Sequence, residues 1–164
     1  PGGSIPTAPK TTGKRLTRIG PETAILTLAT TLGGVFEAAL PNMGLLDWLQ
    51  GLKLSPTIII FFVITFMNIM GLMAIHSIVS GTILLVLFTN ISTGLSDLVF
   101  MQALLTGWGL NTAISLSSLS IVTGATMFEL PMTRLISWSN IIYVFVGGAL
   151  CALILSVINP VLVT

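Results

Sequence analysis

Long runs of apolar residues, separated by short polar links, make up most of this chain. The first run covers residues 23–40 and lies between Pro21 and Pro41. Proline is favoured in the first turn of a helix, and Glu22 adds an acidic side chain where the helix dipole favours one. A helix of about 18–20 residues is as long as the hydrocarbon layer of a bilayer is thick. We therefore predict a transmembrane helix over this run.

The segment between Pro41 and Pro56 has a different, amphipathic pattern. Its leucines recur at helical spacing, and polar side chains lie between them. This pattern is typical of a short helix that lies in the membrane interface, with Trp48 at the level of the headgroups. Together with the first helix it predicts a scaffold unit over residues 21–53.

The apolar stretch 56–90 contains no charged residue but is interrupted by polar residues in its middle. Two complete crossings with a turn need about 40 residues, so a pair of full spans only just fits. If residues 57–67 and 78–90 form two shorter arms, the polar tip lies near the middle of the bilayer. Non-helical backbone at that depth must be surrounded by protein or by a water-filled cavity. We favour a re-entrant hairpin over a pair of full spans.

A further apolar segment, residues 98–127, contains the polar run GWGLNTAISLSSLSIVTG at 107–124. As one continuous helix, this run would place hydroxyls and amides on opposite faces, so the helix would have to be buried in protein. Serine and threonine can bond to carbonyls within their own helix, and small residues help membrane helices to pack closely. Alternatively, the helix breaks over residues 109–118, and the freed polar groups bind ions. We favour the discontinuous helix.

The composition assigns the chain to the membrane proteins. Only 7% of the residues are charged and the mean hydropathy is +1.05, whereas soluble domains are about 25% charged. We expect an all-α integral membrane protein, with transmembrane helices, one re-entrant hairpin and one discontinuous helix. The net charge of +1 gives no reason to expect a nucleic-acid partner. A single cysteine, a single histidine and no HExxH motif offer no enzymatic site and no cofactor site.

The basic residues orient the predicted spans. Residues 1–20 are rich in proline, glycine and threonine, and they predict a flexible polar linker or cytoplasmic tail. The hairpin then enters and leaves from the outside, the broken helix crosses inward, and a last span over 136–163 ends outside. We expect the bacterial inner membrane, with a cytoplasmic N-terminus. The start at Pro1 suggests that the chain is a piece of a longer protein. The basic side chains of the first segment are Lys10, Lys14, Arg15 and Arg18.

This order of elements resembles one half of a transporter of the ion transporter superfamily. That group contains the divalent-anion/sodium symporters, the arsenite pumps and the membrane subunits of the tripartite dicarboxylate transporters. The resemblance covers residues 21–163: a span, an interfacial helix, a polar-tipped hairpin, a broken helix and a final span. In the superfamily, two halves of inverted topology each bring a hairpin tip and an unwound helix to a central site for Na⁺ and an anion.

The resemblance implies that residues 54–164 form a transport-type unit in the C-terminal half of a secondary active transporter. Its partners would be the lipid bilayer and either a missing N-terminal half or a second membrane chain, with a homodimer as one form. It would move a small anion, which we expect to be a carboxylate, coupled to Na⁺ or H⁺ by alternating access.

The hairpin tip and the helix break are the expected binding site. An ionisable residue at membrane depth by default marks a functional site, and His76 is such a residue. The expected sodium ligands are Asn68, Thr112 and Ser115. The full set of expected binding residues is Asn68, Gly71, His76, Ser77, Asn111, Thr112, Ser115, Ser117 and Ser118.

A non-transporting membrane subunit or anchor is the alternative interpretation. In that case the polar run serves helix packing against a partner membrane protein. The transport interpretation has a requirement that the packing interpretation lacks. The two interruptions, 68–77 and 109–118, must meet inside the fold.

Overall fold

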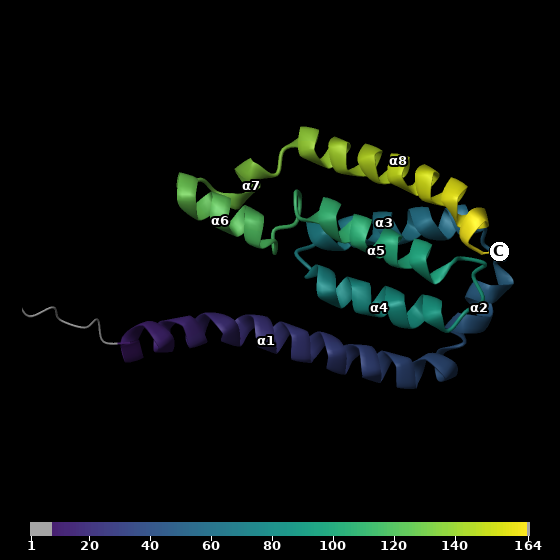
Figure 1. Cartoon of the computed structure of the whole chain (residues 1–164), viewed down its shortest axis with the longest axis horizontal. Helices are drawn as coiled ribbons and strands as arrows, with labels where there is room; N and C mark the ends of the chain where they lie inside the picture. Colours follow the sequence, from purple (N-terminus) through teal and green to yellow (C-terminus); the bar gives the residue numbers. More distant parts are fainter. Residues whose placement is uncertain (1–7, 164) are drawn as a thin grey trace, which may run out of the picture.

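Helices are the only regular elements in the computed structural model, which describes the backbone of residues 8–163 and the side chains of residues 23–163 (Figure 1). The all-α fold class is confirmed for this part of the chain. Insertion into a membrane stays a prediction. In chain order, the elements are α1 (Ala8–Ala39), the 3-10 turn η1 (Leu40–Met43), α2 (Leu45–Gly51), α3 (Pro56–Leu72), α4 (Ser77–Thr89), α5 (Asp97–Asn111), α6 (Leu119–Phe128), α7 (Met132–Leu135) and α8 (Trp138–Leu162).

Two segments are long and apolar enough to cross a membrane by length and composition, namely Thr23–Met43, which covers the end of α1 and η1, and α8. The shorter apolar helices α3, α4 and α6 fall below that length. This difference in length is what the sequence predicts for a hairpin and a discontinuous helix placed between two full spans.

The centre of the fold is the contact of α3 with α5 and α8. Ile64 and Met67 of α3 are completely buried there. The helices approach closely because glycines face them: a Cβ on Gly107 would lie 2.9 Å from the Cβ of Met67, and one on Gly148 would lie 2.9 Å from a methyl group of Ile64. Small residues allow this kind of close packing between membrane helices.

The helix α4 lies between this central group and α1 (Figure 1). Gly33 of α1 faces Thr82 of α4 so closely that no Cβ would fit between them without a shift. In the hairpin, the arm α3 therefore packs on α5 and α8, and the arm α4 packs on α1.

The helices end at different positions along the long axis of the molecule. In Figure 1, the tip of the α3–α4 hairpin stops part-way along this axis, and α6 and α7 extend beyond it. At the other end, Asn159 of α8 accepts a hydrogen bond from the backbone N–H of Ser96 (2.9 Å) and donates one to the carbonyl of Gly94 (3.1 Å). The hairpin thus enters and leaves at the end where α8 finishes, as the predicted topology requires. The membrane side that this end faces stays a prediction.

The hairpin over 56–90 is present, but its turn is shorter than predicted. α3 continues to Leu72, so the non-helical tip consists of residues 73–76, with Ala74 in the left-handed conformation (φ 62°). Asn68 and Gly71, which were expected in the tip, are helical. Asn68 stays in the helix because its amide group donates to the carbonyl of Ile64 one turn earlier (2.9 Å).

The discontinuity in the polar run is also present, and it begins later than predicted. The non-helical stretch is 112–118, between the end of α5 and the start of α6. Gly107 and Gly109 both lie within α5. Gly107 keeps its place there because its missing side chain makes room for Met67.

The N-terminal segment differs from its prediction as a flexible linker. Residues 1–7 lie outside the described part of the chain, but residues 8–20 are helical and continuous with the apolar part of α1. Lysine, arginine and leucine favour helices, and extending an existing helix costs far less free energy than nucleating a new one. Pro21 lies inside this helix, where it cannot donate a backbone hydrogen bond.

The amphipathic segment after η1 forms a helix as predicted, although α2 covers only Leu45–Gly51. Its leucines pack against the core, and Trp48 is exposed. The link between the discontinuous helix and the last span contains the single turn α7.

Gly107→Ala tests the close packing of α3 on α5. We expect the free energy of unfolding to fall by about 1–3 kcal/mol, because the new methyl group overlaps Met67 and presses on the backbone of Ile64. Gly109→Ala, two residues further along α5, is the matched control, since its Cβ meets nothing within 4 Å. Unfolding by sodium dodecyl sulfate in mixed micelles, followed by circular dichroism, measures both. Equal stability of the two variants would contradict this packing.

Candidate functional site

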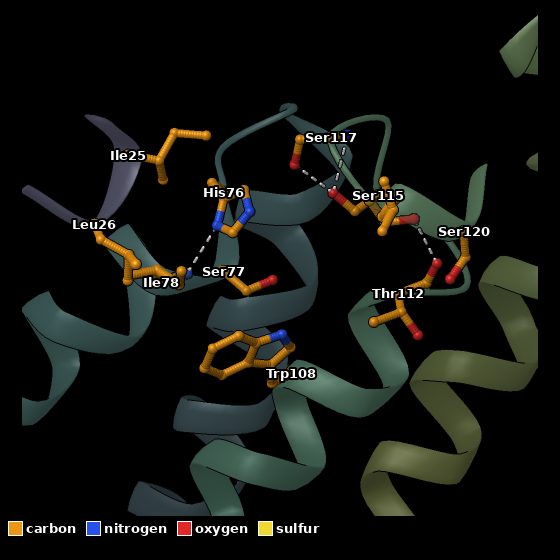
Figure 2. Close-up of a pocket in the computed structure, with 12 residues that line it drawn as sticks. Ile25, Leu26, His76, Ser77, Ile78, Trp108, Thr112, Ser115, Ser117 and Ser120 are labelled. Atoms are coloured by element: carbon orange, nitrogen blue, oxygen red, sulfur yellow. Dashed lines mark hydrogen bonds between the residues drawn. The ribbon is translucent and has the colours of Figure 1, made fainter. Parts of the chain in front are cut away.

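The hairpin tip and the helix break meet at one pocket, with a cavity volume of about 340 Å³. Figure 2 shows the tip residues on one side of this space and the residues of the break on the other. Trp108 from the end of α5 and two aliphatic side chains of α1 complete the walls. The pocket is lined by Ile25, Leu26, His76, Ser77, Ile78, Trp108, Thr112, Ser115, Ser117, Ser118, Leu119 and Ser120.

A buried hydrogen bond joins the tip to the end of α5. The amide nitrogen of Asn111, a residue with no exposed surface, donates to the hydroxyl of Ser77 over 2.7 Å. The amide oxygen of Asn111 lies directly against Gly71, and a Cβ at position 71 would overlap it. Asn111 therefore contacts both arms of the hairpin, the end of α3 and the start of α4.

Hydrogen bonds within the break hold it in a defined shape. The hydroxyl of Ser118 donates to the carbonyl of Thr112 (2.8 Å) and accepts from the N–H of Ile121, which caps α6. The hydroxyls of Ser115 and Ser117 bond to each other over 2.9 Å. These local bonds are the reason a non-helical stretch can be buried, since its backbone and hydroxyl groups find partners nearby.

His76 is the N-cap of α4. Its Nδ1 accepts a hydrogen bond from the backbone N–H of Ile78 over 3.3 Å. A ring nitrogen that accepts carries no proton, so a neutral His76 holds its proton on Nε2. Figure 2 shows this second nitrogen on the side of the ring that faces Ser115 and Ser117.

Several hydrogen-bond donors of the pocket are not used by the protein itself. The Ser77 oxygen already accepts from Asn111, so its own hydrogen is left for a ligand. The pair of Ser115 and Ser117 shares one hydroxyl hydrogen and leaves the other. The N-termini of α4 and α6 both open here, with backbone N–H groups and a partial positive charge. The described lining contains no charged side chain, and its donors suit a ligand rich in acceptor oxygens.

The structure brings six of the nine expected residues to the pocket wall and places the other three behind it. Asn111 and Gly71 form the contact that joins the tip to α5. Asn68 lies in α3 and does not line the pocket, so the three expected sodium ligands do not share it. The amide oxygens of Asn68 and Asn111 and the hydroxyl of Ser80 are buried without a hydrogen-bond partner. Among the described residues, no group of three or more His, Cys, Asp or Glu could hold a metal ion.

Sequence reasoning missed several wall residues. Trp108 precedes Thr112 by one helical turn, and this spacing is a signal that could have placed both on the same face. Ser120 belongs to the polar run itself. Ile25 and Leu26 carry no such signal, because only the packing of α1 across the hairpin brings them to the pocket.

Comparisons of the chain with protein-family models, with curated proteins and with solved structures give no match. The resemblance to the ion transporter superfamily therefore rests on the order of the elements alone.

Asn111→Ala tests the contact between the tip and α5. We expect the rate of amide hydrogen exchange over residues 73–78 to rise roughly threefold. An interhelical polar contact in a membrane protein contributes about 0.6 kcal/mol, and losing that free energy makes local opening about three times as frequent. Asn90→Ala is the matched control, because the Asn90 side chain bonds only to the carbonyl of Val86 in the preceding turn. If the two variants gave the same exchange over these residues, Asn111 would not hold the tip.

Proposed function

We propose that this chain is one half of a secondary active transporter that moves a small carboxylate across a membrane. The observation that carries the proposal is the bond between Ser77 and Asn111. It joins two interruptions that are 34 residues apart in sequence, beside a pocket walled by hydroxyl groups. Helix packing by itself does not require that hydroxyl groups from both interruptions line a common pocket.

The free donors of the pocket support an anionic substrate. A carboxylate has two oxygens that together accept about four hydrogen bonds. The hydroxyls of Ser77 and of the pair Ser115 and Ser117, together with the N-termini of α4 and α6, supply donors from both sides. Discontinuous helices in transporters commonly aim such N-termini at the anionic group of a substrate.

Alternating access would move the pocket past α1. Ile25 and Leu26 are the only wall residues that come from α1 among the described lining. The α3–α4 hairpin and the α5–α6 break would travel together, because Asn111 connects them. A shift of this unit along α1 would remove the aliphatic wall and open the pocket. The chain would couple this movement to Na⁺ or H⁺.

The outward faces of α1 and α8 support a bilayer, a second half of the transporter or a second copy as the surroundings of this unit. Large apolar side chains cover the exposed face of α8, among them Ile142, Leu153 and Val157, each more than half exposed. We place the protein in the bacterial inner membrane with a cytoplasmic N-terminus.

The same exposed faces favour one other candidate, a non-transporting membrane subunit that packs against a partner. In that protein the bond between Asn111 and Ser77 would serve only to hold the helices together, and no solute would pass. A transport measurement separates the two candidates.

Ser115→Ala and Ser117→Ala test the transport proposal in the full-length protein, reconstituted in liposomes. We expect the KM for carboxylate uptake to rise roughly tenfold or more, since a hydrogen bond to a charged group contributes about 1.5–3 kcal/mol. Ser156→Ala is the matched control, because Ser156 bonds to the carbonyl of Leu153 within α8 and does not line the pocket. Uptake would be measured with radiolabelled carboxylates under an imposed Na⁺ or pH gradient.

Uptake that is equal in the parent and in all three variants would contradict a substrate site at the break. A reconstituted parent protein that moves no carboxylate under either gradient would favour the non-transporting subunit.

A further inference from the structure

His76 occupies a backbone donor that the substrate would also use. Its Nδ1 accepts from the N–H of Ile78, in the first turn of α4. The next two N–H groups of this helix, those of Val79 and Ser80, are bonded to the carbonyl of His76. The N-terminus of α4 therefore has only the N–H groups of Ser77 and Ile78 to offer a ligand, and the imidazole takes one of them.

The protonation state of the ring decides whether that donor is free. Neutral imidazole accepts at one nitrogen, but imidazolium carries a proton on both nitrogens and cannot accept at all. Once protonated, His76 can no longer bond to the N–H of Ile78. A neutral His76 and a bound anion thus compete for one N–H group, whereas a protonated His76 releases it and adds a positive charge to the pocket.

We propose that His76 binds the coupling proton and that its protonation admits the carboxylate to the N-terminus of α4. A hydronium ion gives one proton to the lone pair of Nδ1: its O–H bond breaks, the N–H bond forms, and a neutral water molecule leaves. A carboxylate oxygen then accepts from the N–H of Ile78, and the two opposite charges offset each other at membrane depth. This inference rests on the proposed function, because it names H⁺ as the coupling ion of that same site.

His76 is the basic side chain in the described lining of the pocket. The walls that face it from α1, α5, the 112–118 stretch and α6 consist of aliphatic side chains, Trp108 and hydroxyls. The chain has a single histidine, and histidine is the side chain that ordinarily changes charge between about pH 5 and 8. The charged side chains of the described part of the chain lie outside the lining: Glu37, Asp47, Lys53, Asp97, Glu129 and Arg134.

His76→Asn is the decisive variant. Asparagine is among the best N-cap residues, so its side-chain oxygen can accept from the first turn of α4 at any pH. The variant therefore keeps the cap and removes the titration. The experiment is equilibrium binding of radiolabelled acetate and of radiolabelled benzoate to the full-length protein in detergent, between about pH 5 and 8, where imidazole titrates.

In the parent protein we expect the affinity for the two carboxylates to rise as the pH falls, by up to about tenfold per pH unit, the limit for one proton taken up per anion. In His76→Asn we expect the affinity to be independent of pH over the same interval. Binding to the parent that does not depend on pH, or a pH dependence that persists in His76→Asn, would overturn the proposal and leave the transport function intact.

A second measurement needs no ligand. Nuclear magnetic resonance of the protein with isotopically labelled histidine reports which ring nitrogen holds the proton, and a single histidine gives a single set of signals. We expect Nε2–H in the neutral form and a change in the Ile78 amide signal at the pH where the ring titrates. A proton on Nδ1 in the neutral form would overturn the proposal. A third outcome is that the expected tautomer is seen but the protein neither binds nor takes up any carboxylate. This outcome would contradict the transport function, and with it the coupling role.

Discussion

The amide of Asn111 is the contact on which the rest of the interior depends. Its nitrogen bonds to Ser77 at the start of α4, and its oxygen lies against Gly71 near the end of α3. The ends of α3 and α5 and the start of α4 thus meet at a single side chain. Because Asn111 is completely buried, breaking this bond would leave its amide nitrogen without a partner, as its amide oxygen already is.

The pocket follows from that contact. Asn111 brings the tip close to the break, but the break begins directly after it and turns away from the helix axis. The hydroxyls of Ser115, Ser117 and Ser118 then form hydrogen bonds within the 112–118 stretch. Some hydroxyl donors of this stretch are left facing the tip. The same residues that allow the helix to end inside the fold also place hydroxyl groups on the wall of the cavity.

The sequence predicted which helices form more accurately than where they end. It also predicted that the two interruptions meet, but not what each residue in them contacts. Apolar runs set the helices, and proline set the start of α3. Asn68 was misplaced because a helical asparagine can bond to its own backbone, which a pattern of polar residues does not show. The wall formed by Ile25 and Leu26 depends on how α1 crosses the hairpin, and no local pattern encodes that crossing.

Asn159 ties α8 to the residues just before α5 through two bonds of opposite sense, one accepted from Ser96 and one donated to Gly94. The two helices are thus pinned to each other at the end that is remote from the cavity. At the other end of α5, Gly147 and Gly148 of α8 lie against Leu110, next to Asn111, so the last helix is held on α5 near the cavity as well. One asparagine that lies well away from the cavity thus helps to set how far along α5 the last helix lies.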